Sequence, residues 1–193
     1  MTKIYNYDDF KTLLQKRLNP KRYQHSLCVA EEAVRLAKKY GCDIEKAYLA
    51  GLLHDITKNS TEEEHLHIFN TFGIMLNDVE KNAEKLWHAM SGAAFIEHEL
   101  KIDDMDIITA VRYHTTARAN MSLLEKVIYL ADFTSADRDY DDVSIMRQKV
   151  EISIDEAMRY ALTYTINDLT ERNKPLHLDT VCAYNEIFLK GKV

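Results

Sequence analysis

Residues 50–58 read Ala50-Gly51-Leu52-Leu53-His54-Asp55-Ile56-Thr57-Lys58, and the rest of the chain is organised around them. Apolar side chains recur at helical spacing from Ile44 to Leu53, which predicts that the stretch is the C-terminal half of a buried helix. His54 and Asp55 are adjacent metal-ligand types, and Lys58 follows one helical turn later. Burying these three groups together costs several kcal/mol unless something compensates. A bound cation is the most economical compensation; a His-Asp pair that caps a helix at the surface is the alternative.

The composition is that of an ordinary globular protein with one domain: 193 residues, 46% of them apolar and 29% charged. Five glycines and two prolines provide little turn chemistry, so we expect helices with short connections. The net charge of −6 argues against a general nucleic-acid-binding surface. Three cysteines without CxxC spacing indicate a reducing compartment, and the sequence contains no run of about 18 apolar residues. We therefore expect a cytoplasmic protein with neither nucleic acid nor membrane as a partner.

Apolar periodicity and capping residues predict an all-α helical bundle that forms a single domain over residues 1–193. Its core is expected at about residues 20–143, with C-terminal helices at about 142–189 packed on it. Capping boxes are predicted at Ser60–Glu63 and at Ser122–Glu125. Helices are expected at residues 7–17, 20–40, from 43 through the central stretch, 60–72, 77–100, 103–113, 123–133, 142–173 and 178–189.

Four histidines are expected to lie outside any site. His65 and His67 have i, i+2 spacing among glutamates, which places them on different helix faces, and both are expected at the surface. His98 has charged neighbours on both sides and is expected to be solvated. His177 starts the last helix, where a surface or capping role is expected.

Six further imidazoles and carboxylates stand in or next to apolar helical segments, at spacings too wide for local chelation. They are His25, His54, Asp55, His88, His114 and Asp132. Only a folded bundle gathers residues this far apart, as bundle cores do for metals. Imidazole and carboxylate ligands together suit a divalent first-row metal such as iron, manganese or cobalt, and the lack of cysteine argues against a structural zinc site. Gly92, close to His88, indicates a close approach by a neighbouring helix or a ligand.

The order His, His-Asp, His, His, Asp resembles the signature of the HD-domain superfamily in its two-metal form. Four segments (residues 22–30, 50–58, 114–116 and 125–132) look like the YqeK family of HD-domain hydrolases, which split diadenosine tetraphosphate symmetrically into two ADP. The resemblance covers roughly residues 20–143. It implies two divalent metal ions, with iron as the expected metal, and a homodimer.

Carried over by position, the resemblance implies that His25, His54, Asp55 and Asp132 hold one metal ion. Asp55 would bridge to a second ion held by His88 and His114. Two such cations clamp a phosphate group and make a water nucleophilic near neutral pH.

The negative charge on the phosphoryl oxygens in the transition state needs further cations and hydroxyl groups around it. Lys58 is placed to stabilise the transition state as a second catalytic residue beside Asp55. Arg22, Thr115, Arg118 and Arg138 are the predicted substrate-binding residues.

Two departures from the family pattern concern the predicted substrate loops. Residues 133–138 replace a usual Ile-Glu-Pro run before the arginine, and Ala117 stands where a glycine is common. They put the nucleotide preference in doubt and leave the ligands intact. Three other functions stay open: an HD-fold di-iron oxygenase, a catalytically silent nucleotide sensor, and a nucleotidase or phosphodiesterase acting on another nucleotide.

Overall fold

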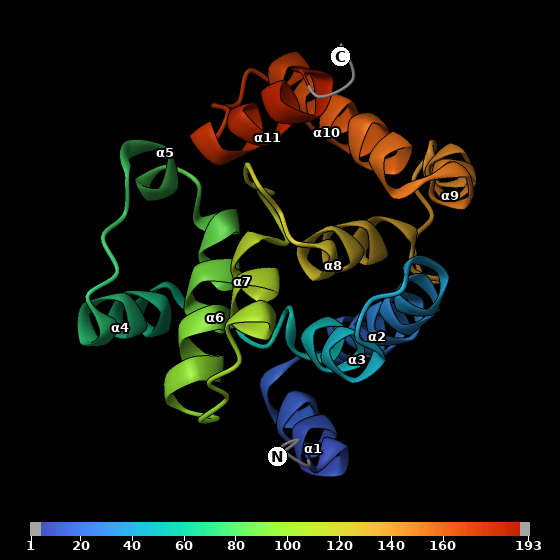
Figure 1. The fold of residues 1–193 in the computed structure, drawn as a ribbon. Coiled ribbons are helices and arrows are strands. Elements are labelled where there is room, and N and C mark those ends of the chain that lie inside the picture. The colour runs from blue at the N-terminus through green and yellow to red at the C-terminus, as the bar shows by residue number, and fades with distance from the viewer. Residues whose placement is uncertain (1–4, 190–193) are drawn as a thin grey trace.

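A computed structural model of the chain describes residues 5–189, which form eleven α-helices and one short 3-10 helix (Figure 1). In chain order they are α1 (Tyr7–Arg17), α2 (Pro20–Tyr40), α3 (Ile44–Leu53), α4 (Glu62–Phe72), α5 (Asp78–Lys81), η1 (Glu84–Leu86), α6 (Trp87–His98), α7 (Met105–Tyr113), α8 (Leu123–Thr134), α9 (Val143–Ile152), α10 (Ile154–Glu171) and α11 (Leu178–Leu189). No β-strand occurs among the described residues. The predicted all-α class is confirmed.

One hydrophobic core runs through the molecule and makes it a single domain. Helices α2, α3, α7 and α8 pack against one another at its centre, and α9 and α10 pack on α8. The core cluster extends from Leu14 in α1 to Ile187 in α11. In Figure 1 the C-terminal helices α9–α11 lie together along one side of the bundle.

Several helix ends follow the capping signals. Asn19 caps α2 before Pro20, and Gly41 ends this helix with φ 77°. The Ser122–Glu125 capping box opens α8 as predicted. The box of α4 instead pairs Thr61 with Glu64, one residue later than expected, because the Thr61 side chain accepts the Glu64 N–H.

Two long predicted helices are broken, and the prediction was wrong at both places. In the 77–100 segment α5 ends at Lys81, and Glu80 O accepts from both Trp87 Nε1 (2.6 Å) and Ala83 N (3.2 Å). In the 142–173 segment Ser153 is extended (φ −163°, ψ 158°), and its hydroxyl accepts from Glu156 N (3.0 Å). A serine that caps a new helix competes with continuing the old one.

The central stretch is only partly helical. Helix α3 ends at Leu53, and residues 54–59 form successive tight turns with bonds such as Lys58 N to Asp55 O (2.8 Å). The His54 ring lies 2.7 Å from Gly51 O through Nδ1, so the side chain takes a carbonyl that a continuing helix would use. This turn directs both His54 and Asp55 into the bundle.

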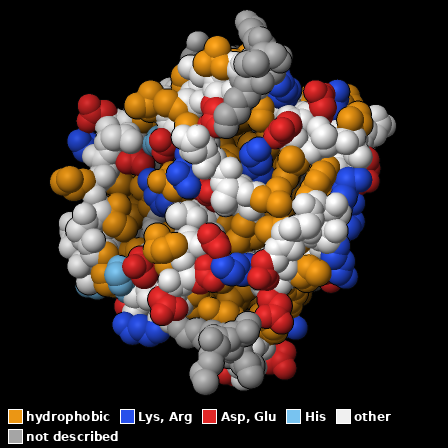
Figure 2. All heavy atoms as spheres, in the orientation of Figure 1, with side chains coloured by type: hydrophobic (Ala, Val, Ile, Leu, Met, Phe, Trp, Pro, Cys, Tyr) orange, Lys and Arg blue, Asp and Glu red, His pale blue; other side chains and the backbone are white. Residues whose placement is uncertain are grey.

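No described helix is long and apolar enough to cross a membrane. On the face shown in Figure 2, acidic and basic side chains are interspersed, and no continuous basic stripe appears on it.

Gly51 allows the closest helix contact that the site depends on, between α2 and α3. A Cβ atom added at Gly51 would lie 2.9 Å from Ala30 Cα and 3.2 Å from Ala33 Cβ. At Gly92 an added Cβ would meet Thr57 Oγ1 at 3.4 Å, which is an ordinary contact. The expected close approach at Gly92 is therefore the turn that follows Asp55.

We predict that Gly51→Ala lowers the free energy of unfolding by about 1–3 kcal/mol, because the added methyl group overpacks a backbone contact. The gain in helix propensity, about 1 kcal/mol, opposes this loss. Urea denaturation followed by circular dichroism measures the change. Gly92→Ala is the matched control and should change stability less; equal losses for both variants would contradict the packing argument.

Candidate metal centre

Five separate elements bring the six predicted ligands into one cluster. His25 comes from α2, His54 and Asp55 from the turn after α3, His88 from α6, His114 from the end of α7, and Asp132 from α8. The first five residues are buried, and the side chain of Asp132 is 20% exposed. Polar atoms of this set form three triads in which all three atoms lie within 4.8 Å of one another: His25, His54 and Asp55; His54, His114 and Asp132; Asp55, His88 and His114.

The Asp55 carboxylate lies between two groups of imidazoles. Its Oδ2 atom is 3.3 Å from His54 Nε2 and 4.0 Å from His25 Nε2. Its Oδ1 atom is 3.1 Å from His88 Nε2 and 3.7 Å from His114 Nε2. Each oxygen therefore faces its own pair of nitrogens, which is the geometry a bridging carboxylate needs.

Asp132 completes the side of the cluster that contains His25. Asp132 Oδ1 lies 2.9 Å from His25 Nε2 and 3.9 Å from His54 Nε2. The triad that it forms with His54 and His114 also reaches toward the second side of the cluster. Asp132 thus stands near both imidazole groups, although its shorter contacts are to the first.

Backbone carbonyls orient two of the rings. The Nδ1 atoms of His54 and His114 lie 2.7 Å from the carbonyls of Gly51 and Val111, and each donates its proton there. This leaves both Nε2 atoms as lone-pair donors toward the cluster. His54 Nε2 and Asp55 Oδ1 are buried without a hydrogen-bond partner. Orphaned acceptors of this kind fit a metal ion, which is the partner that this donor set suits.

The charge states also suit metal binding. Burial alone raises the pKa of Asp55, but His54, His114 and His88 hold that pKa well below its usual range. Burial likewise opposes ionisation of Asp132, whereas His25 and Arg138 lower its pKa well below the usual range. Burial lowers the pKa of His88 to about 4. Both carboxylates are therefore anionic and His88 is neutral near pH 7.

Three predicted cations line the cluster. Lys58 Nζ lies 3.1 Å from His88 Nε2 and 4.0 Å from Asp55 Oδ1. Arg22 Nη1 is 2.8 Å from Asp55 Oδ2, and Arg138 Nη2 donates to Asp132 Oδ1. The side chains of Lys58, Arg22 and Arg138 are each about one third exposed, so they border the cluster on its solvent side.

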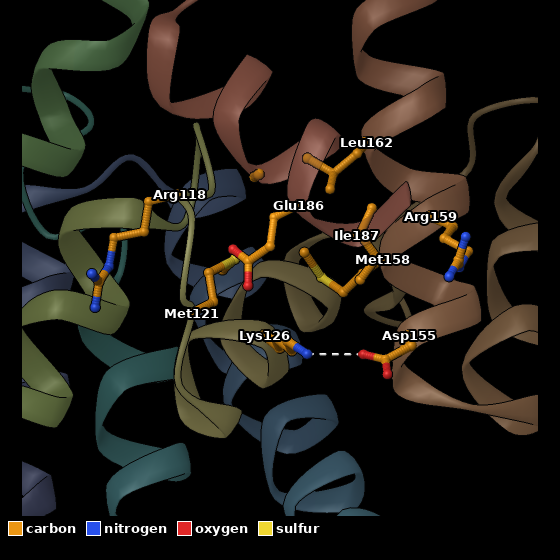
Figure 3. A pocket seen from close by; sticks show the side chains of 10 residues that line it. Arg118, Met121, Lys126, Asp155, Met158, Arg159, Leu162, Glu186 and Ile187 are labelled. Atoms are coloured by element: carbon orange, nitrogen blue, oxygen red, sulfur yellow. Dashed lines mark hydrogen bonds and ion pairs between the residues drawn. The ribbon is translucent and has the colours of Figure 1, made fainter. Parts of the chain in front are cut away.

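Arg118 and Thr115, which were also predicted to bind the substrate, do not border the cluster as Lys58, Arg22 and Arg138 do. The Arg118 guanidinium is paired with the buried Glu125 (Nε to Oε1, 2.5 Å), and it lines a cavity of about 250 Å³ between α8, α10 and α11 (Figure 3). None of the six clustered residues lines that cavity. Thr115 directly follows His114, and its Oγ1 atom is buried without a hydrogen-bond partner.

Ala117, which stands where the family commonly has glycine, has φ 57° and is buried. This left-handed backbone favours glycine, so an alanine at this position adds local strain.

Sequence reasoning missed Asp137, which lies in a segment that reads as a polar loop. Asp137 Oδ2 is 2.8 Å from His25 Nδ1, and Ser135 Oγ donates to Asp137 Oδ1 (2.8 Å). The carboxylate therefore fixes the ring of His25 and turns Nε2 toward the cluster. A carboxylate five residues after Asp132 was the available signal, but local spacing could not connect it to His25.

His65, predicted at the surface, is buried, and that prediction was wrong. His177 is also buried and contacts Glu80 Oε1 through Nε2 (3.2 Å), but it accepts from Asp179 N, so the capping alternative predicted for it is confirmed. His65 Nδ1 is 2.8 Å from Ser91 Oγ. His67 is exposed, as expected. His98 is partly exposed and stacks on Phe72 (4.1 Å between centroids).

His65 starts a buried chain of hydrogen bonds that ends at a clustered residue. Ser91 Oγ lies 2.9 Å from Thr57 Oγ1, and Thr57 Oγ1 donates to His88 O (2.8 Å). The chain ties α4 and α6 to the turn that carries His54 and Asp55. Burial lowers the pKa of His65, so the neutral ring is the form that this packing stabilises.

The HD domain family matches residues 22–137 of this chain. A symmetrical bis(5'-nucleosyl)-tetraphosphatase of Halalkalibacterium halodurans is 37% identical over 93% of this chain and 96% of its own length. The Bacillus subtilis protein of the same name is 34% identical over the same shares. A crystal structure from Clostridium acetobutylicum, titled a predicted HD superfamily hydrolase involved in NAD metabolism, superposes with a TM-score of 0.93. It is 35% identical, over 97% of this chain and all of that one.

The buried His-Asp cluster within an all-helical bundle thus belongs to an HD-domain protein. Over nearly its whole length the chain belongs to the YqeK family of HD-domain hydrolases, as its motifs predicted.

We predict that His65→Gln lowers the free energy of unfolding by about 1–3 kcal/mol at pH 7, because it disturbs a buried hydrogen-bond chain. The depressed pKa of His65 means that the unfolded chain takes up its proton first as pH falls. The wild type therefore loses this stabilisation below pH 6.5, and its advantage over His65→Gln shrinks toward pH 5. Urea titrations at several pH values measure it. His67→Gln, on the exposed face, should match the wild type throughout.

Proposed function

We propose that this protein hydrolyses diadenosine tetraphosphate symmetrically to two ADP at the clustered histidines and aspartates. The observation that carries the proposal is the Asp55 carboxylate, whose two oxygens face separate pairs of imidazoles. Relatives at 33–37% identity that carry the name symmetrical bis(5'-nucleosyl)-tetraphosphatase support the substrate and the position of cleavage.

The donor set fits two divalent cations. We assign His25, His54, Asp55 and Asp132 to one ion and Asp55, His88 and His114 to the other. Two of the three triads fall within these sets, and the third, His54, His114 and Asp132, spans them. When bound, such ions supply Lewis acidity toward phosphate oxygens and a nucleophile near neutral pH. Iron is the metal that we propose, with manganese and cobalt as alternatives, because mixed imidazole and carboxylate ligands suit all three.

The surrounding cations bind and stabilise the polyphosphate. One water adds to a phosphorus atom at the middle of the tetraphosphate, the bridging P–O bond breaks, and the oxygen leaves with the second ADP. Lys58, beside Asp55 and His88, is placed to stabilise the charge on the equatorial oxygens. Arg22 and Arg138 border the cluster and are assigned to the other phosphates. The pairing of Arg118 with Glu125 favours a structural role for it instead.

A cytoplasmic location and a homodimer also belong to this proposal. Three free cysteines support a reducing compartment. The homodimer rests on family resemblance alone, and light scattering coupled to size exclusion tests it.

We predict that Asp55→Ala removes metal and activity together, because this carboxylate faces both imidazole groups. Lys58→Ala should lower turnover by about 10²–10³-fold while metal content stays near the wild-type level, since electrostatic stabilisation of this kind has that magnitude. Elemental analysis of protein purified without chelators, combined with ADP release from diadenosine tetraphosphate, measures both effects. Loss of metal from Lys58→Ala would show that its role here is misassigned.

The same assay under anaerobic conditions separates hydrolysis from oxygenase chemistry. ADP release without O₂ is expected. Turnover that requires O₂ would replace the proposal with the di-iron oxygenase, and nucleotide recovered uncleaved with metal-loaded protein would indicate a sensor.

We predict that Asp137→Asn weakens metal binding by about 10–100-fold, the usual effect of removing a carboxylate that orients a ligating histidine. The amide keeps the size of the side chain but cannot accept the His25 proton with the strength of an anion. Competition with a chromogenic chelator measures the affinity. Asp139→Asn, at an exposed carboxylate two residues along, is the control and should bind metal like the wild type. Equal weakening in both variants would show that Asp137 does not act by orienting His25.

A further inference from the structure

A second cavity is lined by residues that neighbour His88 and His114 in the sequence, although none of the six clustered residues lines it. It has a volume of about 370 Å³ and lies between η1 with the preceding turn, the segment after α7, and the end of α10 with the loop that leads to α11. Leu86, two residues before His88, and Thr115, directly after His114, line it. Two walls of the cavity therefore continue directly from the cluster.

Part of the lining suits a flat ring, and Lys85, Arg172 and Lys174 add cationic side chains elsewhere on the wall. Leu86, Leu169 and Pro175 give apolar surface from three segments far apart in the sequence. Thr115, Thr116 and Thr165 add hydroxyl-bearing side chains. A recess of this volume that combines apolar surface with polar groups is typical of small-molecule sites. The buried Thr115 hydroxyl has no hydrogen-bond partner within the protein, and a polar atom of a ligand would supply one.

Buried polar contacts hold the cavity open. Glu80 Oε1 accepts from Arg112 Nη2 (3.1 Å) and lies 3.2 Å from His177 Nε2, which joins α5, α7 and the loop before α11. Thr180 Oγ1 donates to Thr116 O (2.7 Å), which joins α11 to the segment after His114. Both ring nitrogens of His177 are engaged, so this residue supports the wall. These contacts fix the walls before a ligand arrives.

We infer that this cavity binds one adenosine moiety of the dinucleotide, with the polyphosphate running from Thr115 to the clustered histidines. The inference rests on the proposed function, because the cluster supplies the phosphate end of the site. One cavity of this size holds one nucleoside. The same pocket therefore binds the nucleoside of the ADP product, and it makes a purine nucleotide bind more tightly than its bare phosphates.

Calorimetry with two probes tests the inference on manganese-loaded protein. ADP carries the nucleoside, and pyrophosphate carries the phosphates alone. Leu169→Trp fills the cavity and should weaken ADP binding by about tenfold or more while pyrophosphate binding stays within about twofold. Thr115→Val, nearly isosteric, should weaken ADP binding by a few-fold. Leu66→Trp, at an exposed leucine on α4, is the control and should bind both probes like the wild type.

Unchanged ADP affinity in Leu169→Trp, or equal weakening of both probes, would overturn the inference. Photolabelling of the wild type with 8-azido-ADP needs no variant: labelled peptides are expected at residues 82–86 or 165–175, and labels confined elsewhere would also overturn it. Failure of the proposed function has a different signature, since the wild type would then release no ADP from diadenosine tetraphosphate. A wild type that hydrolyses the dinucleotide but fails these binding tests refutes the cavity alone.

Discussion

A single anionic carboxylate, buried among four imidazoles, is the constraint on which the rest of this molecule depends. Without compensation Asp55 would be costly at 2% exposure, since an isolated buried charge destabilises a fold by several kcal/mol. His54, His88, His114 and Arg22 surround it and keep it ionised. The fold therefore has to deliver five separate elements to one point with little freedom in their spacing.

Small residues and side-chain hydrogen bonds make that delivery possible. Gly51 lets α3 approach α2, and the His54 ring ends α3 by binding the Gly51 carbonyl. The turn that results is held against α6 through Thr57 and Ser91. Packing, helix termination and the position of the clustered groups are thus consequences of the same few residues.

Most of the helical order was predictable because it is encoded locally. Capping residues such as Asn19 and Ser122 indicate where helices begin, and apolar periodicity indicates which helix face is buried. The breaks at Asn82 and Ser153 were missed because apolar periodicity does not report side-chain hydrogen bonds to the backbone, such as those of Trp87 and Ser153. His65 was misplaced because its glutamate neighbours suggested solvent, whereas Ser91 on another helix provides its partner.

The grouping of the six candidate ligands came from residue types and family resemblance, and the structure brings these side chains together. Asp137 could not be predicted in the same way, because no family motif included it and its partner His25 lies 112 positions away in the sequence. Their roles in catalysis rest on the proposed function.

The dispersal of the cluster over five elements also sets an order of events during folding. No two neighbouring segments of the unfolded chain can chelate an ion, apart from the single His54-Asp55 pair, so a cation gains little from an unstructured polypeptide. Loop closure over more than a hundred residues must come first, at an entropic cost that core packing has to offset. A cation would therefore bind only after the bundle has assembled, to an apoprotein that is already compact.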